Sequence, residues 1–177
     1  MNTKKITLFA YLLLLISLVS CDKWLYDDKL TLDKQPYNGD ELRTDGYYYY
    51  TNQGEILDTY FFYRNGIIIH GVFSDSNSSY PIASMDSLFV SDDIASDLGK
   101  YNYGVFQIIG DDIMIEKWVY LSGRRRVLML SGKIMNDTTF VLDKSENTNT
   151  GNVFQMDKLF HFHAMSHKPD STNNFIP

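Results

Sequence analysis

The feature that most constrains the fold is a series of short segments rich in Tyr, Phe, Ile and Val, separated by residues typical of turns. These residue types favour the half-buried, pleated surface of a β-sheet, where successive side chains point to opposite faces. The segments that fit this description are 44–51, 56–64, 66–73, 103–110, 112–121, 126–135, 138–144 and 152–165. Most neighbouring segments are close enough in sequence to pair as antiparallel hairpins, so an all-β domain is predicted.

Three dipeptides identify the tightest of these hairpins. Asn65-Gly66 predicts a type I′ turn, because both central residues of that turn need positive φ angles, which Asn and Gly adopt readily. Gly110-Asp111 and Asn136-Asp137 are typical of two further tight turns.

The periodicity changes near residues 82–98, where apolar residues recur at intervals of three or four. These residues are Ile82, Met85, Leu88, Phe89, Ile94 and Leu98. The spacing predicts a short amphipathic helical segment that ends at Gly99. A loop that packs over the end of the β-domain is the alternative.

The first twenty residues have the layout of an export signal. Lys4 and Lys5 precede a mainly apolar run over residues 6–19, which is shorter than the roughly 20 residues that span a bilayer. The run ends in Leu18-Val19-Ser20-Cys21, which resembles the bacterial lipobox. The resemblance implies cleavage before Cys21 and attachment of fatty acyl chains, such as palmitate, to this cysteine. An ordinary signal peptide followed by a chance cysteine, or a permanent membrane span, is the alternative.

Acylation of Cys21 predicts a protein anchored by lipid in the cell envelope. The residues after it, Asp22 and Lys23, match known sorting signals only in part. Inner membrane, periplasmic face and cell surface are therefore alternatives, and we expect the outer membrane, on its periplasmic or surface face.

Cleavage would divide the chain into a signal peptide (1–20), a lipidated N-terminus and tether (21–43), and one domain (44–177). The tether is assigned because residues 22–43 are polar, charged and aperiodic. After cleavage 14 basic and 22 acidic residues remain, which gives a net charge of −8. No nucleic-acid partner is expected, because phosphates would repel such an acidic chain.

Several short motifs follow one another in a recognisable order. They are Asp45-Gly46-Tyr47-Tyr48, Phe62-Tyr63-Arg64-Asn65-Gly66, Tyr103-Gly104-Val105-Phe106, Asn136-Asp137-Thr138-Thr139-Phe140 and Lys168-Pro169-Asp170-Ser171. Their order, over residues 42–177, resembles the small lipocalin-like lipoproteins of Bacteroides-type bacteria, whose function is generally unassigned. The resemblance implies an antiparallel meander that closes into a lipocalin-like barrel of about eight strands. Such a barrel holds one small ligand or fills with its own side chains.

Apolar residues that alternate along the strands are candidates for a ligand-binding wall inside this barrel. They are Tyr48, Phe61, Phe106, Ile108, Trp118, Leu128, Phe140 and Leu142. They predict a non-catalytic binding protein for a small apolar or amphipathic ligand, with plain core packing as the alternative for each residue. The alternative function is a structural or accessory subunit of an envelope protein complex, with exposed tyrosines as anchors.

A cluster of cations provides a candidate anion site. Arg124, Arg125 and Arg126 follow Ser122-Gly123 between two strands and could hold a phosphate or carboxylate. Arginines in turns are more often solvated, which is the alternative.

A pair of histidines provides a candidate metal site. His161 and His163 are two residues apart on the last strand and therefore share a face, where His70 or His167 could join them. A solvated position at the rim is the alternative. No phosphate-binding glycine loop, Gly-x-Ser-x-Gly motif or mature cysteine nucleophile is present, so neither a catalytic residue nor a cofactor is predicted.

Overall fold

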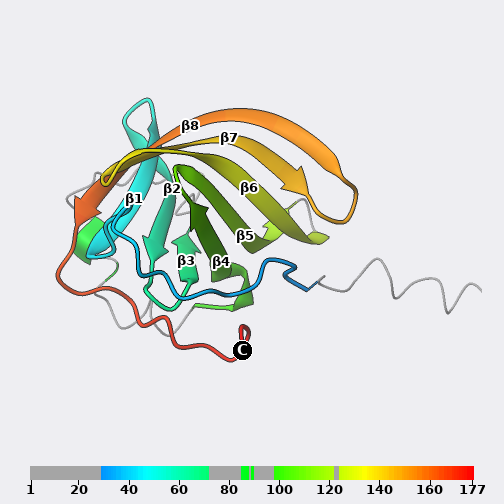
Figure 1. The fold of residues 1–177 in the computed structure, drawn as a ribbon, viewed down its shortest axis with the longest axis horizontal. Coiled ribbons are helices and arrows are strands. Elements are labelled where there is room, and N and C mark those ends of the chain that lie inside the picture. Colours follow the sequence, from blue (N-terminus) through cyan, green and yellow to red (C-terminus); the bar gives the residue numbers. More distant parts are fainter. Residues whose placement is uncertain (1–28, 72–84, 88, 90–97, 122–123) are drawn as a thin grey trace, which may run out of the picture.

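Eight antiparallel strands form the protein in the computed structural model, which describes residues 29–71, 85–87, 89, 98–121 and 124–177. In chain order they are β1 (Gly46–Asn52), β2 (Glu55–Phe62), β3 (Ile67–Gly71), β4 (Tyr103–Ile109), β5 (Asp112–Leu121), β6 (Arg124–Asn136), β7 (Thr139–Asn147) and β8 (Asn152–Ala164). Each strand pairs with the next, and β8 also pairs with β1, so the sheet closes into a barrel (Figure 1). The prediction of an all-β meander barrel of about eight strands is confirmed.

The helical segment expected near residues 82–98 is described only in part. Residues 85–87 and 89 are helical, and a turn of 3-10 helix, η2 (Lys100–Asn102), leads into β4. Met85 and Phe89, which the apolar spacing places on one helix face, are both buried. The rest of the segment lies outside the described residues.

The hairpin at Asn65-Gly66 forms, but its turn type differs from the prediction. Only Gly66 has a positive φ (83°), and the amide of Tyr63 donates a hydrogen bond to the Ile67 carbonyl (3.0 Å) across a longer loop. Two consecutive positive φ angles, the signature of a type I′ turn, occur instead at Gln53 (54°) and Gly54 (86°) between β1 and β2.

The other two predicted turns are present at or next to the expected dipeptides. Ile109 pairs with Asp112, so Gly110-Asp111 forms a two-residue loop. Asn136 pairs with Thr139, which moves the third loop one residue along the chain, to Asp137-Thr138.

The interior of the barrel contains a continuous apolar cluster, which we call the interior core. Its buried members are Tyr37, Leu42, Tyr48, Tyr60, Phe62, Ile68, Phe106, Ile113, Ile115, Leu130, Ile134, Phe140, Leu142 and Phe160. Every strand of the barrel contributes at least one of them, so the cluster is the shared inner face of the closed sheet.

A second buried cluster, the outer core, lies on the outside of the barrel. Its members are Tyr47, Ile56, Phe61, Ile67, Ile69, Met85, Phe89, Tyr103, Val105, Trp118, Val127, Met165 and Ile176. The strand residues in it alternate with interior residues of the same strands. Figure 1 shows the chain on either side of the barrel sequence, residues 29–45 and the C-terminal segment after β8, passing along the side formed by β2–β5.

The segment before β1 closes one end of the barrel. The Tyr37 amide donates to the Arg64 carbonyl (2.9 Å), and the Arg43 amide donates to the Asp137 carbonyl (3.1 Å). The segment therefore crosses from the β2–β3 turn to the β6–β7 turn, and Leu42 between these points is fully buried. We call this the closed end. Residues 29–43 thus pack against the barrel; residues 21–28 lie outside the described part.

Candidate functional site

The residues predicted to form a ligand wall divide between the two cores. Tyr48, Phe106, Phe140 and Leu142 are buried in the interior core, and Ile108 and Leu128 pack against it at partly buried positions. Phe61 and Trp118 instead lie in the outer core. Their neighbours Tyr60, Phe62 and Lys117 take the interior positions, because side chains alternate along a strand.

At the closed end, aromatic side chains fill the interior. The rings of Phe140 and Phe160 stack with centroids 4.8 Å apart, and Phe62 makes edge contacts with Phe106 (4.9 Å) and Phe140 (5.8 Å). Tyr48 packs on the same group at 5.2–5.5 Å. This half of the barrel is therefore core rather than a ligand chamber.

At the opposite end, interior-facing side chains become accessible to solvent. Tyr50, Leu128 and Met156 pack against the interior core but are only half-buried. Phe154 lies across from Ser145, which in turn pairs with the interior residue Leu130, and it is 61% exposed. We call this the open end; its walls are apolar.

Between the packed half and the open end lies a group of buried polar side chains, the interior polar cluster: Asp58, Tyr60, His70 and Lys117. Lys117 Nζ donates to Tyr60 Oη (2.6 Å), lies 3.5 Å from His70 Nδ1 and is 3.9 Å from Asp58 Oδ1. All four residues are at most 6% exposed. Strands β2, β3 and β5 supply them from interior-facing positions.

Burial sets the protonation of this cluster. It lowers the pKa of Lys117, while the nearby Asp58 carboxylate acts in the opposite direction. It also lowers the pKa of His70 well below its ordinary value, with the Lys117 charge adding to the effect and the Trp118 carbonyl opposing it. Burial raises the pKa of Tyr60. His70 and Tyr60 are therefore neutral, and Lys117 and Asp58 form a buried ion pair.

Asp58 Oδ1 and His70 Nε2 have no partner within hydrogen-bond distance, although Asp58 Oδ1 lies in the ion pair with Lys117. Buried polar atoms in native proteins nearly always have a partner, in the protein or in bound water or ligand. Lys158, whose side chain is 32% exposed, extends the cluster toward solvent with Nζ 3.5 Å from Asp58 Oδ2.

Sequence reasoning did not identify this cluster, apart from naming His70 as a possible metal ligand. A signal was present, because Asp58 and Lys117 are charged residues in the middle of mainly apolar strands. From the sequence alone, a charged residue in such a strand is equally compatible with a position facing solvent. Only the register of the closed barrel places the side chains of both Asp58 and Lys117 inside.

A cavity of about 680 Å³ lies outside the barrel, between residues 29–35, strands β4 and β5, and the C-terminal segment. We call it the outer cavity. It is lined by Lys29, Leu30, Leu32, Asp33, Lys34, Gln35, Lys100, Val105, Trp118, Phe175, Ile176 and Pro177. Its size is within the usual range for small-molecule sites.

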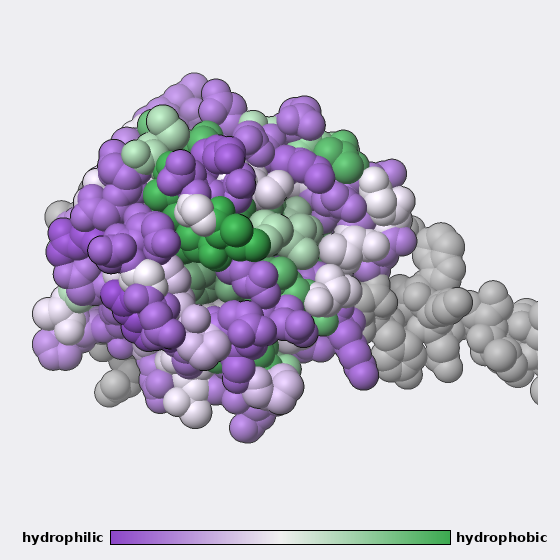
Figure 2. All heavy atoms as spheres, viewed as in Figure 1, coloured by the Kyte–Doolittle hydropathy of each residue, from purple (hydrophilic) through white to green (hydrophobic). Residues whose placement is uncertain are grey.

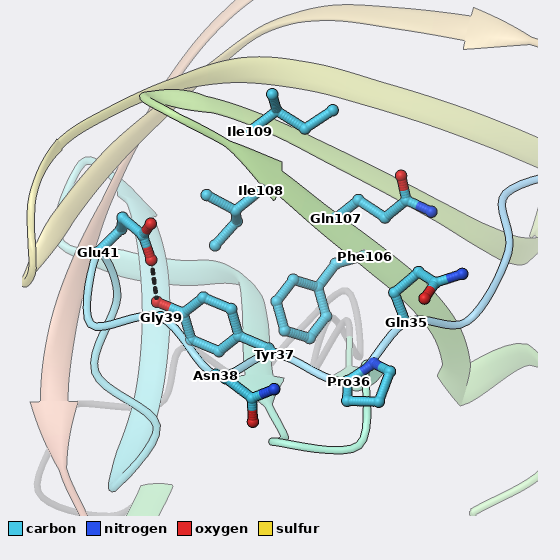
Figure 3. A pocket seen from close by; sticks show the side chains of 10 residues that line it. All are labelled: Gln35, Pro36, Tyr37, Asn38, Gly39, Glu41, Phe106, Gln107, Ile108 and Ile109. Carbon is cyan, nitrogen blue, oxygen red and sulfur yellow. Dashed lines mark hydrogen bonds between the residues drawn. The ribbon is translucent and has the colours of Figure 1, made fainter.

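A smaller hollow of about 250 Å³ lies beside the closed end (Figure 3). Phe106, Ile108 and Ile109 of β4 line it together with the crossing segment, and Tyr37 Oη donates to Glu41 (3.0 Å). Figure 2 shows hydrophobic side chains gathered in a hollow near the middle of this otherwise mostly hydrophilic face. Because this hollow is small and its floor is made of packed core residues, we interpret it as a shallow surface depression.

Two of the candidate metal ligands, His161 and His163, lie on the outer face of β8, whereas His70 lies inside the barrel and His167 follows β8. His163 Nε2 is 3.1 Å from Asp86 Oδ2, and its ring lies against Tyr47 (5.2 Å). His161 is exposed beside Tyr49, and His167 contacts Ser166. In the described part of the chain, no group of three or more His, Cys, Asp or Glu side chains is placed to hold a metal ion.

The three arginines begin strand β6 instead of forming a turn. Arg124, Arg125 and Arg126 pair with Leu121, Tyr120 and Val119 of β5. The run therefore belongs to the hairpin of β5 and β6.

Large exposed apolar side chains are spread over the molecule. Those among the described residues are Ile109, Tyr120, Met135, Val153, Phe154, Leu159 and Phe175. They belong to β4, β5, β6, β8 and the C-terminal segment.

Comparisons with models of protein families, with curated proteins and with solved structures found no match to this chain. Among the described residues, no helix has the length and apolar character needed to cross a bilayer.

Proposed function

We propose that this protein is a lipid-anchored lipoprotein of the cell envelope whose barrel binds a small amphipathic molecule at its open end. Cys21 carries the lipid in this proposal, and the resemblance to lipocalin-like lipoproteins supports the same assignment. The membrane is the outer membrane.

The difference between the two halves of the barrel interior supports this function most directly. One half is filled by rings, whereas the other half has accessible apolar walls at Tyr50, Leu128 and Met156. The walls lead to buried polar side chains, Asp58 and Lys117 among them. Apolar walls with a few convergent polar groups are the usual makeup of a small-molecule site.

The outer cavity is the second candidate position for the same ligand. Its volume and the Trp118 side chain in its wall favour it.

Calorimetric titration of the purified full chain with 1-octanol tests binding and its position. We expect saturable binding that Met156→Trp weakens at least about tenfold by filling the open end. Val153→Trp, on the outer face of the same strand, serves as the matched control and should leave affinity unchanged. Loss of binding in Leu30→Trp alone would place the ligand in the outer cavity, and no binding to the native chain would refute the function.

The anchor is tested separately in cells. Native protein should incorporate labelled palmitate and sediment with membranes, and Cys21→Ala should do neither. Sedimentation of an unlabelled Cys21→Ala protein with membranes would contradict the proposed anchor.

A further inference from the structure

The lining of the outer cavity is partly apolar, and this apolar part extends to solvent. Val105, Trp118 and Ile176 are each at most 8% exposed, whereas Phe175 in the same lining is 41% exposed. Leu30 of the N-terminal segment is half-buried. A ligand with an apolar chain would therefore be stabilised by covering these side chains.

Hydrogen bonds hold the N-terminal wall of the cavity in place. The Glu116 carboxylate accepts from the amides of Thr31 and Leu32 (both 2.6 Å), and Gln107 Nε2 donates to the Asp33 carbonyl (2.8 Å). Glu116 itself does not line the cavity. The wall is thus attached to β4 and β5 without a ligand, as in the largely pre-formed sites that bind small molecules.

Ammonium groups are in excess around this apolar lining. Lys29, Lys34 and Lys100 line the cavity, whereas Asp33 contributes one carboxylate and a terminal carboxylate at Pro177 would contribute a second. The whole chain has a formal net charge of −6. The cavity lining therefore has the opposite sign to the molecule as a whole, and it would attract an anion.

One of these ammonium groups lies against the apolar lining. Lys100 Nζ is 4.6 Å from the centre of the Trp118 ring, which is a cation–π distance. Lys29 and Lys34 are exposed, and neither has an ion-pair partner in the described part of the chain. An anionic head group can therefore meet the lysines while the chain attached to it covers Trp118.

We propose that the outer cavity is a binding site for an amphipathic anion, that is, an apolar chain with an anionic head group. The chain packs on Trp118, Leu30 and Phe175, and the head group contacts the lysines of the lining. This inference goes beyond the proposed function, because it concerns a second site and a charged ligand and does not depend on binding at the open end.

Other classes of small molecule match only part of this lining. Inorganic phosphate would leave the apolar side chains in water, and an alkylammonium would be repelled by the three lysines. A neutral alcohol would gain from the apolar side chains but not from the charges. The order of affinities among these compounds therefore tests the inference.

Calorimetric titration of the purified full chain with octanoate tests the position of the site. We expect Leu30→Trp, which fills the cavity, to weaken octanoate binding at least about tenfold. Leu159→Trp, the same substitution at an exposed position of β8, is the matched control and should leave the affinity unchanged. Met156→Trp should also leave it unchanged, because Met156 packs at the open end and does not line the outer cavity. Loss of octanoate binding in Met156→Trp but not in Leu30→Trp would overturn the inference.

The preference for negative charge is tested in the Met156→Trp protein, in which the open end is filled. Octanoate should bind about tenfold more tightly than 1-octanol, and octylammonium and inorganic phosphate should bind most weakly. Lys100→Gln should weaken octanoate by about tenfold and leave 1-octanol unchanged, a selectivity that general loss of structure would not produce. Lys144→Gln, in a surface pair with Glu146, is the control. Equal affinities for octanoate and octylammonium would overturn the inference.

Tryptophan fluorescence locates the anion without filling the cavity. The chain has two tryptophans, so in Trp24→Phe protein the tryptophan fluorescence comes from Trp118 in the cavity wall. 8-Bromooctanoate should quench this fluorescence in a saturable manner, and octanoate should reverse the quenching. This measurement replaces Leu30→Trp if that variant does not fold, and octanoate binding without quenching by the bromo compound would overturn the inference.

The two proposals can fail separately. If octanoate does not bind the native chain, the inference is overturned, whereas binding of 1-octanol at the open end is unaffected. If octanoate binds saturably to a chain that does not bind 1-octanol, the function proposed for the open end is refuted and the second site is supported.

Discussion

At the scale of single residues, Tyr48 and Tyr37 bury their rings while keeping their hydroxyl groups hydrogen-bonded. Tyr48 buries its ring in the interior core, accepts from the Arg43 amide (2.9 Å) and donates to the Asp137 carbonyl (2.5 Å). Tyr37 at the closed end accepts from the Leu42 amide (2.7 Å). Burial raises the pKa of Tyr48, and it raises the pKa of Tyr37 to about 12. Above the ordinary tyrosine pKa, the folded state therefore binds more protons than the unfolded state.

We expect the free energy of unfolding to fall as pH rises above about 10, the ordinary pKa of tyrosine. For Tyr37 the loss should extend to about pH 12. Tyr37→Phe should cost about 1 kcal/mol at neutral pH, since it removes the acceptor of the Leu42 amide, but should make the alkaline loss shallower. Urea unfolding over this pH range measures both effects, with exposed Tyr120→Phe as the control. An unchanged alkaline slope in Tyr37→Phe would contradict this explanation.

At the scale of elements, one carboxylate attaches the N-terminal segment to β5. Glu116 on the outer face of β5 is fully buried and accepts hydrogen bonds from the amides of Thr31 and Leu32 (both 2.6 Å) and from Thr31 Oγ1 (2.9 Å). Hydrogen bonds to a buried charge are stronger than neutral ones. The contact holds Leu30 and Leu32 over the outer core and forms one wall of the outer cavity.

Glu116→Gln should release this segment. The amide keeps one acceptor oxygen but turns a donor toward backbone N–H groups, so we expect a loss of about 2 kcal/mol. Hydrogen exchange at the Thr31 and Leu32 amides should accelerate, while the amides of β7 remain protected. Glu146→Gln, in a surface pair with Lys144, is the control and should change little. Unchanged protection at Leu32 would show that the segment is held by its apolar contacts instead.

At the scale of the whole molecule, one sheet separates two cores. Phe61 and Phe62 are consecutive in β2 and each is 1% exposed, yet Phe62 belongs to the interior core and Phe61 to the outer core. Strands β1–β4 are therefore buried on both faces, whereas the outer face of β8 carries exposed residues such as Leu159 and His161.

Phe61→Ala and Phe62→Ala should destabilise the protein to a similar extent, by about 3–5 kcal/mol each, because each leaves a cavity in a packed cluster. Chemical denaturation of the two variants measures this, with Phe154→Ala at the exposed open end as the control. A cost below about 1 kcal/mol for Phe61→Ala would mean that the outer layer is a loose cover and not a second core.

The number, order and type of the strands were predictable from the sequence, because tight turns and β-forming residues act locally. The inward face was not predictable for the early strands. Runs such as Tyr47–Tyr50 and Ile67–Ile69 are apolar at every position, since both faces are buried and alternation disappears. Phe61 and Trp118 were assigned to the interior for this reason.

What only the tertiary structure decided is which polar residues the closed barrel encloses and what covers its outside. Asp58 and His70 come from the β2–β3 hairpin and Lys117 comes from β5, much later in the sequence, and the register of the sheet makes them neighbours. The polar segment 29–43 gave no local signal of packing, because its contacts are to Glu116, the β2–β3 turn and the β6–β7 turn. Local patterns thus determined the meander, while closure of the sheet determined the site.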